Sequence, residues 1–206
     1  MKQMNYVLIL IISALTILSC APKKPPIERN HFVLEVPKHE TLSTIKIPAT
    51  LSVRELSVSP GYMGKEIVYR TDGNKIQSDF YNQYFIPPGP MITQSLRTWL
   101  SKKQLFNNII SPASHMPADF ILEGNIVSIY GDFQDSQNYH AFIQIEFLLL
   151  KDLDMDYEIV FNKTYTLRKP IENKSVQSLV NGLNQALGFI FTSLENDLSL
   201  QLRHYK

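Results

Sequence analysis

A long apolar stripe near the C-terminus places the strongest constraint on the fold of this chain. Its apolar side chains recur at steps of three and four residues, at Val176, Leu179, Val180, Leu183, Leu187, Ile190, Phe191, Leu194 and Leu198. This spacing predicts an α-helix with one apolar face, and Ser175 is a suitable N-cap. A helix of about 25 residues is nearly 40 Å long at about 1.5 Å per residue. Such a stripe must be buried, most simply across the face of a sheet.

Further patterns predict a sheet and a second helix. Pro90 suits the first turn of a helix, and residues 90–105 place Ile92, Leu96 and Leu100 on one face. Alternating or apolar runs predict strands at 31–36, 51–58, 65–70, 75–80, 109–110, 119–130, 139–150 and 158–167. The sequence therefore predicts a single α+β domain, with a mixed or antiparallel sheet and two amphipathic helices packed on one face.

The N-terminus has the features of a lipoprotein signal peptide over residues 1–19. Lys2 precedes an apolar run that ends at Leu18, shorter than the about 20 residues of a membrane span. Ile17-Leu18-Ser19-Cys20 resembles the lipobox of bacterial lipoproteins, which implies cleavage before Cys20 and acylation of that cysteine, for example with palmitate. An uncleaved anchor, or an ordinary signal peptide with a chance cysteine, is the alternative.

The lipobox resemblance also implies a location and a domain plan. Ala21, rather than Asp, follows the cysteine, which implies the inner leaflet of the outer membrane, facing the periplasm. Residues 20–30 then form a Pro- and Lys-rich tether, and residues 31–206 form one periplasmic domain.

Composition and motifs argue against several classes of function. The chain has 20 basic and 19 acidic residues, whereas a nucleic-acid-binding protein needs a basic excess. Cys20 is the only cysteine, and the five histidines lack metal-ligand spacing. The acidic run 152–156 lacks the Gly and Glu of an EF-hand, so it is interpreted as a turn. We expect no enzyme activity, no metal and no cofactor.

Aromatic residues gather in two parts of the chain. One group comprises Tyr62, Tyr69, Tyr81, Tyr84, Phe85 and Trp99. The other flanks a predicted turn and comprises Tyr130, Phe133, Tyr139 and Phe142. Aromatic side chains are enriched at protein interfaces, although most of them could equally fill the core.

Several blocks of residues resemble one known family. They are Leu51-x-Val53, Val58-x-Pro60-x-Tyr62-Met63, Ile67-Val68-Tyr69-Arg70, Tyr81-Asn82-x-Tyr84-Phe85 and Ala118-Asp119-Phe120-x-Leu122-x-Gly124-x-Ile126. Over about residues 30–202 the chain resembles the ABC-type transport auxiliary lipoprotein family, whose members are PqiC-like. That family usually has Trp-Ala where this chain has Tyr84-Phe85.

The resemblance implies a function. Family members are envelope lipoproteins that accompany an MCE-domain protein and an ABC permease in lipid transport. This chain would be a non-catalytic docking or structural subunit anchored in the outer membrane, with Tyr62, Tyr84 and Phe85 as candidate partner contacts. An independent periplasmic carrier, which shields a lipid or another hydrophobic ligand between helix and sheet, is the alternative. Both leave room for a homo-oligomer.

Overall fold

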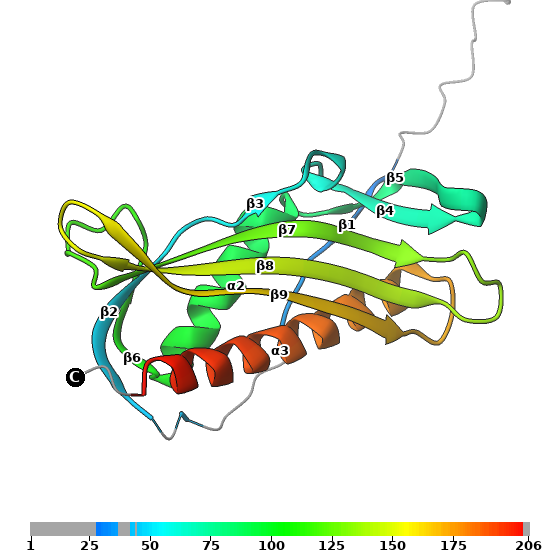
Figure 1. Ribbon diagram of the computed structural model, residues 1–206. Coiled ribbons are helices and arrows are strands. Elements are labelled where there is room, and N and C mark those ends of the chain that lie inside the picture. The colour runs from blue at the N-terminus through cyan, green and yellow to red at the C-terminus, as the bar shows by residue number, and fades with distance from the viewer. Residues whose placement is uncertain (1–27, 37–41, 44, 204–206) are drawn as a thin grey trace, which may run out of the picture.

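The computed structural model describes residues 28–36, 42–43 and 45–203. The predicted signal peptide, Cys20 and the tether up to residue 27 lie outside the described residues. Within the described part, nine strands form one mixed sheet that curls around two α-helices (Figure 1). The predicted α+β architecture is confirmed.

The described residues form nine strands, two α-helices and two short 3-10 turns. The strands are β1 (Asn30–Phe32), β2 (Ile47–Val53), β3 (Ser57–Val58), β4 (Glu66–Thr71), β5 (Lys75–Tyr84), β6 (Phe106–Ile110), β7 (Phe120–Asp132), β8 (His140–Asp152) and β9 (Tyr157–Pro170). The helices are α2 (Pro88–Lys103) and α3 (Val176–Gln201), and the short 3-10 turns are η1 (Pro60–Tyr62) and η2 (Asp72–Asn74).

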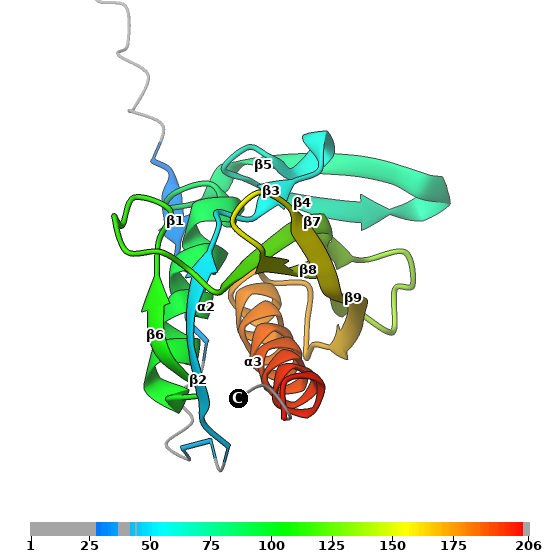
Figure 2. The same ribbon diagram turned by 60° about the vertical axis from the view of Figure 1, so that its left-hand side comes forward.

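Strand β7 organises the sheet. One of its edges pairs antiparallel with β8 along nearly its whole length, and β8 pairs antiparallel with β9. Its other edge pairs parallel with three short strands in succession: β2 near its start, β3 in its middle and β4 at its end. Beyond these, β6 pairs with β2, β5 pairs with β4 and β1 pairs with β5. The sheet is therefore splayed and curled, with both helices inside the curve (Figure 2).

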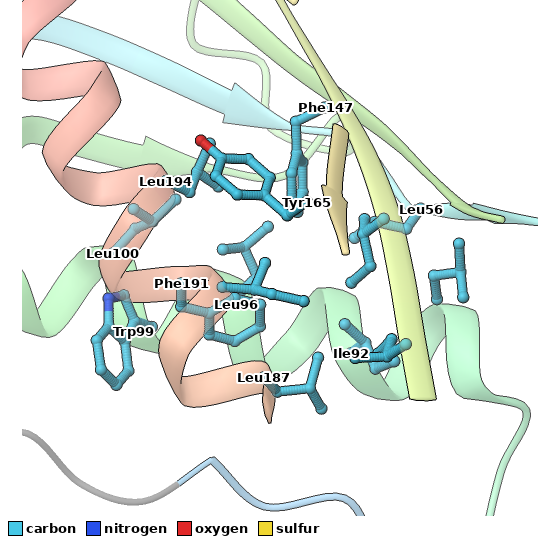
Figure 3. Packing of buried hydrophobic residues seen from close by; sticks show 14 of the residues in the cluster. Leu56, Ile92, Leu96, Trp99, Leu100, Phe147, Tyr165, Leu187, Phe191 and Leu194 are labelled. Atoms are coloured by element: carbon cyan, nitrogen blue, oxygen red, sulfur yellow. The ribbon is translucent and has the colours of Figure 1, made fainter. Parts of the chain in front are cut away.

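The apolar stripe of α3 is buried as its periodicity predicts. Leu183, Leu187 and Leu194 are fully buried and belong to one core with the inner face of β8. The two helices meet through Trp99 of α2 and Phe191 of α3, whose ring centroids are 6.0 Å apart (Figure 3). At the start of α3, the Ser178 N–H donates to Ser175 Oγ over 3.2 Å, so the predicted N-cap is confirmed.

Gly182 lets α3 approach the sheet closely. A Cβ built on this residue would lie 2.8 Å from Cβ of Ala141 on β8 and 2.5 Å from Cγ2 of Ile171. Both distances are shorter than carbon atoms tolerate, so any side chain here would push helix and sheet apart.

The strand predicted over 51–58 is divided in two. It runs as β2 to Val53 and resumes as β3 at Ser57. Between them, the Leu56 N–H donates to Thr93 Oγ1 of α2 over 2.9 Å, and the Leu56 side chain enters the core. The backbone turns toward the helix here, which an alternating pattern does not reveal. The strand predicted over 75–80 in turn extends to Tyr84.

Candidate functional site: an aromatic and arginine cluster on the outer face

The three predicted partner contacts lie in different surroundings. Tyr84 is only 2% exposed and belongs to the core, so it has no surface to offer a partner and that part of the prediction is corrected. Burial also raises the pKa of its phenol. Phe85, one residue later, is 60% exposed. Tyr62 is half-buried in η1 and stacks on Tyr130. The structure does not bring the three together.

Tyr62 is part of an aromatic stack on the outer face of the sheet, away from the helices. Its ring centroid lies 6.2 Å from that of Tyr130, with 17° between the ring planes. Tyr130 stacks in turn on Phe142 of β8, which is its cross-strand neighbour, at 4.7 Å and 20°. Side chains alternate along a strand. Because Ile129 belongs to the helix-facing core, Tyr130 faces outward.

A buried carboxylate lies beside this stack. Asp132, two residues after Tyr130 and on the same face, is 2% exposed. Its Oδ2 accepts hydrogen bonds from Arg70 Nη2 of β4 over 3.2 Å and from Arg168 Nε of β9 over 3.3 Å, and Arg168 Nη2 lies 3.2 Å away. The Arg70 guanidinium also lies 5.3 Å from the Tyr130 ring centroid. We call Tyr62, Arg70, Tyr130, Asp132, Phe142 and Arg168 the outer cluster.

The electrostatics of the outer cluster favour an electron-rich or anionic partner group. Two guanidinium groups face one carboxylate, which leaves one positive charge uncompensated within the cluster. The side chains of Arg70 and Arg168 are 33% and 51% exposed, so both can still reach a partner. Asp132 holds them in place, because a buried carboxylate stays favourable only while it is paired. Burial raises the pKa of Tyr130, so its phenol is neutral at physiological pH.

The sequence indicates Tyr62 as a candidate contact, but it does not indicate the charged residues Asp132 and Arg168 of the outer cluster. Asp132 lies beyond the strand predicted over 119–130, whereas β7 continues through it. Arg70 and Arg168 lie 62 and 36 positions from Asp132 and meet it only through strand pairing. The one local signal was that Tyr130 and Asp132 share a face at a spacing of two residues.

Two further features of the described residues bear on function. Among the described residues, no group of three or more His, Cys, Asp or Glu side chains is placed to hold a metal ion. In that same part of the chain, neither helix combines the length and apolar character needed to cross a membrane.

The architecture is shared with solved structures. Protein XCC0632 from Xanthomonas campestris, a DUF330 protein, matches with a TM-score of 0.73 at 16% identity, over 85% of this chain and 98% of that one. A second, uncharacterised protein matches with a TM-score of 0.65 at 14% identity, over 84% and 99%. No family model and no curated protein matches the sequence. The chain therefore has the fold of a DUF330 protein.

Proposed function

We propose that the protein is an outer-membrane-anchored accessory lipoprotein of an MCE/ABC-type lipid transport system, and that it docks on a partner without catalysis. The observation that carries this proposal is the position of one residue from each of two family-like motifs. Val58-x-Pro60-x-Tyr62-Met63 contributes Tyr62 to the outer cluster, and Ile67-Val68-Tyr69-Arg70 contributes Arg70. One residue from each of these two motifs thus lies beside Tyr130 on the same outward-facing surface.

The outer cluster has the chemistry of a docking surface. Tyrosine and arginine, together with tryptophan, are enriched at the hot spots of binding surfaces. Here both are already ordered, by ring stacking on Tyr130 and by the hydrogen bonds to Asp132. The fitting partner is a periplasmic protein surface with carboxylate and aromatic groups, which we assign to the MCE-domain protein, with the ABC permease bound behind it.

The anchor in this proposal is Cys20, acylated in the inner leaflet of the outer membrane. The alternative of an independent carrier needs a space between helix and sheet. The side chains of α3 that face the sheet, such as Leu187 and Phe191, are fully buried against core residues of β8. This packing does not favour the carrier.

The proposal is tested by affinity purification of the tagged protein from envelopes solubilised in mild detergent. We expect an MCE-domain protein, with or without its permease, in the eluate. Recovery of the tagged protein alone, at equal yield, would contradict the docking role.

A matched pair of variants tests the surface. Tyr62→Ser removes one ring of the outer stack, and we expect recovery of the MCE-domain protein to fall at least about fivefold, as for a hot-spot residue. Tyr157→Ser makes the same change at a 52% exposed position, the first residue of β9, and recovery should be unchanged. Equal losses in both variants would show that the outer cluster is not the docking surface.

A further inference from the structure

Strand β5 carries a bulge that displays two aromatic residues. Glu66 of β4 pairs with Gln83 and Val68 pairs with Ser78, so four residues of β5 lie opposite a single residue of β4. Asp79 stabilises the bulge, since its Oδ1 accepts hydrogen bonds from the N–H groups of Tyr81 and Asn82, both over 2.9 Å. The bulge turns Phe80 and Tyr81 outward, where they are 48% and 57% exposed.

Two partly buried hydrogen bonds also stabilise the bulge. The Tyr69 hydroxyl donates to Asp79 Oδ2 over 2.8 Å, and Asn82 Nδ2 donates to the same oxygen over 2.9 Å. Burial alone would raise the pKa of Asp79, but the hydrogen bonds from Asn82 and Tyr69 outweigh it and lower that pKa below its usual value. The carboxylate is therefore ionised at neutral pH, and the two rings are presented in a fixed position.

More apolar surface continues from the bulge. The Phe80 and Tyr81 rings meet edge to face at 5.4 Å. At the end of β5, Phe85 and Ile86 are 60% and 37% exposed, and Phe85 contacts His31 of β1 edge to face. We call Phe80, Tyr81, Phe85 and Ile86 the aromatic rim. Exposed apolar groups gathered in this way mark a surface that meets an apolar partner.

The tether enters the domain at the aromatic rim. β1 pairs with β5 at Asn82–Tyr84, and the Arg29 guanidinium lies 4.4 Å from the Phe80 ring centroid. The eight residue steps from Cys20 to Glu28 can span at most about 29 Å, less than the about 40 Å length of the 13-residue β7. An acylated Cys20 therefore holds the rim end of the domain near the bilayer.

We infer that the aromatic rim lies on the phospholipid surface in which the Cys20 acyl chains are embedded, and that it fixes the orientation of the domain on the membrane. This inference rests on the lipid anchor of the proposed function. Tyr and other amphipathic rings prefer the headgroup region, where one edge is apolar and the other is wet.

The charge of residues 20–30 also supports contact with a phospholipid surface. Residues 20–30 contain Lys23, Lys24 and Arg29 against one acidic residue, Glu28. This basic excess is attracted to anionic headgroups. Arg29 carries its charge directly over Phe80, so a headgroup phosphate and the apolar region below it can be contacted together.

The test uses the full mature lipoprotein in vesicles of phosphatidylethanolamine and phosphatidylglycerol. Because Cys20 is the only cysteine and acylation blocks its thiol, an introduced cysteine is the only free thiol. Tyr81→Cys and Phe85→Cys place a polarity-sensitive dye on the aromatic rim. Met155→Cys is the control. This 98% exposed residue follows β8, whose end pairs with the start of β7, whereas β4, which lies opposite the bulge of β5, pairs with the end of β7 (Figure 1).

Flotation of the vesicles is measured first, and then quenching of the dye by brominated phospholipid. We expect the protein to float and quenching at positions 81 and 85 to be at least about threefold greater than at position 155. Floating protein with solvent-like dyes at 81 and 85, or with equal quenching at all three positions, overturns the inference while the lipid anchor stands. Failure to float overturns the anchor and the inference together.

Discussion

Because α3 approaches β8 closely at Gly182, we expect Gly182→Ala to lower the free energy of unfolding, although the same substitution stabilises most helices. Replacing glycine by alanine inside a helix normally stabilises it by about 1 kcal/mol. Here the added Cβ would lie 2.8 Å from Cβ of Ala141 and 2.5 Å from Cγ2 of Ile171. Ala141 has no rotamer to change, so the new methyl group has to move backbone.

The magnitude follows from these two opposing effects. Overpacking a core with one methyl group costs about 1–3 kcal/mol. We place Gly182→Ala near the top of that range, because both contacts are under 3.0 Å. Subtracting the helix-propensity gain leaves a net destabilisation of about 1–2 kcal/mol.

Urea unfolding followed by circular dichroism measures this effect. With a typical slope, the midpoint should fall by about 0.5 M. Asn181→Ala, an exposed neighbour on α3, is the control and should change the free energy of unfolding by no more than about 0.5 kcal/mol. Adding Ala141→Gly removes one clash, and the double mutant should recover about 1 kcal/mol relative to additivity. A Gly182→Ala protein more stable than wild type would refute the argument, because it would mean that helix and sheet are not in close contact there.

Two further predictions concern single hydrogen-bonded groups. Thr93 Oγ1 accepts a hydrogen bond from the Leu56 N–H and donates one to the Gly89 carbonyl. Thr93→Val leaves the buried Leu56 N–H without this acceptor, so the free energy of unfolding in urea titrations should fall by about 1–3 kcal/mol. An unchanged urea midpoint would contradict this prediction. Burial alone would raise the pKa of Asp197, but hydrogen bonds from Lys163 and Tyr165 outweigh it and lower that pKa. The carboxylate therefore stabilises the fold above its unfolded pKa of 3.8 and loses that contribution as the pH falls through its folded pKa. The stability gap between wild type and Asp197→Asn should be wide at about pH 7 and narrow toward about pH 3, whereas a gap that is constant with pH would contradict the assignment.

Local sequence patterns predicted the helices and strands better than the contacts between them. The helix after Ser175 was predicted with its cap and its buried face, because periodicity and capping are properties of neighbouring residues. The strand predicted over 75–80 gives no orientation for Tyr84, and only the continuation of β5 past its bulge turns that ring inward. The ion pairs of Asp132 could not be predicted from the sequence, because the strand register across β4, β7, β8 and β9 brings their members together.

The segment that follows the tether has a mechanical consequence. β1 runs parallel to β5 over three residues, so a pull on the chain from before residue 28 loads their hydrogen bonds in shear, all at once. Immediately behind β1, the Leu34 N–H donates to Met91 Sδ of α2 over 3.3 Å, and the Glu35 N–H donates to Asn184 Oδ1 of α3 over 3.0 Å. Leu34 itself is 1% exposed. Tension on the chain before residue 28 is thus passed to both helices and to the core between them, so the edge of the sheet does not carry the load alone.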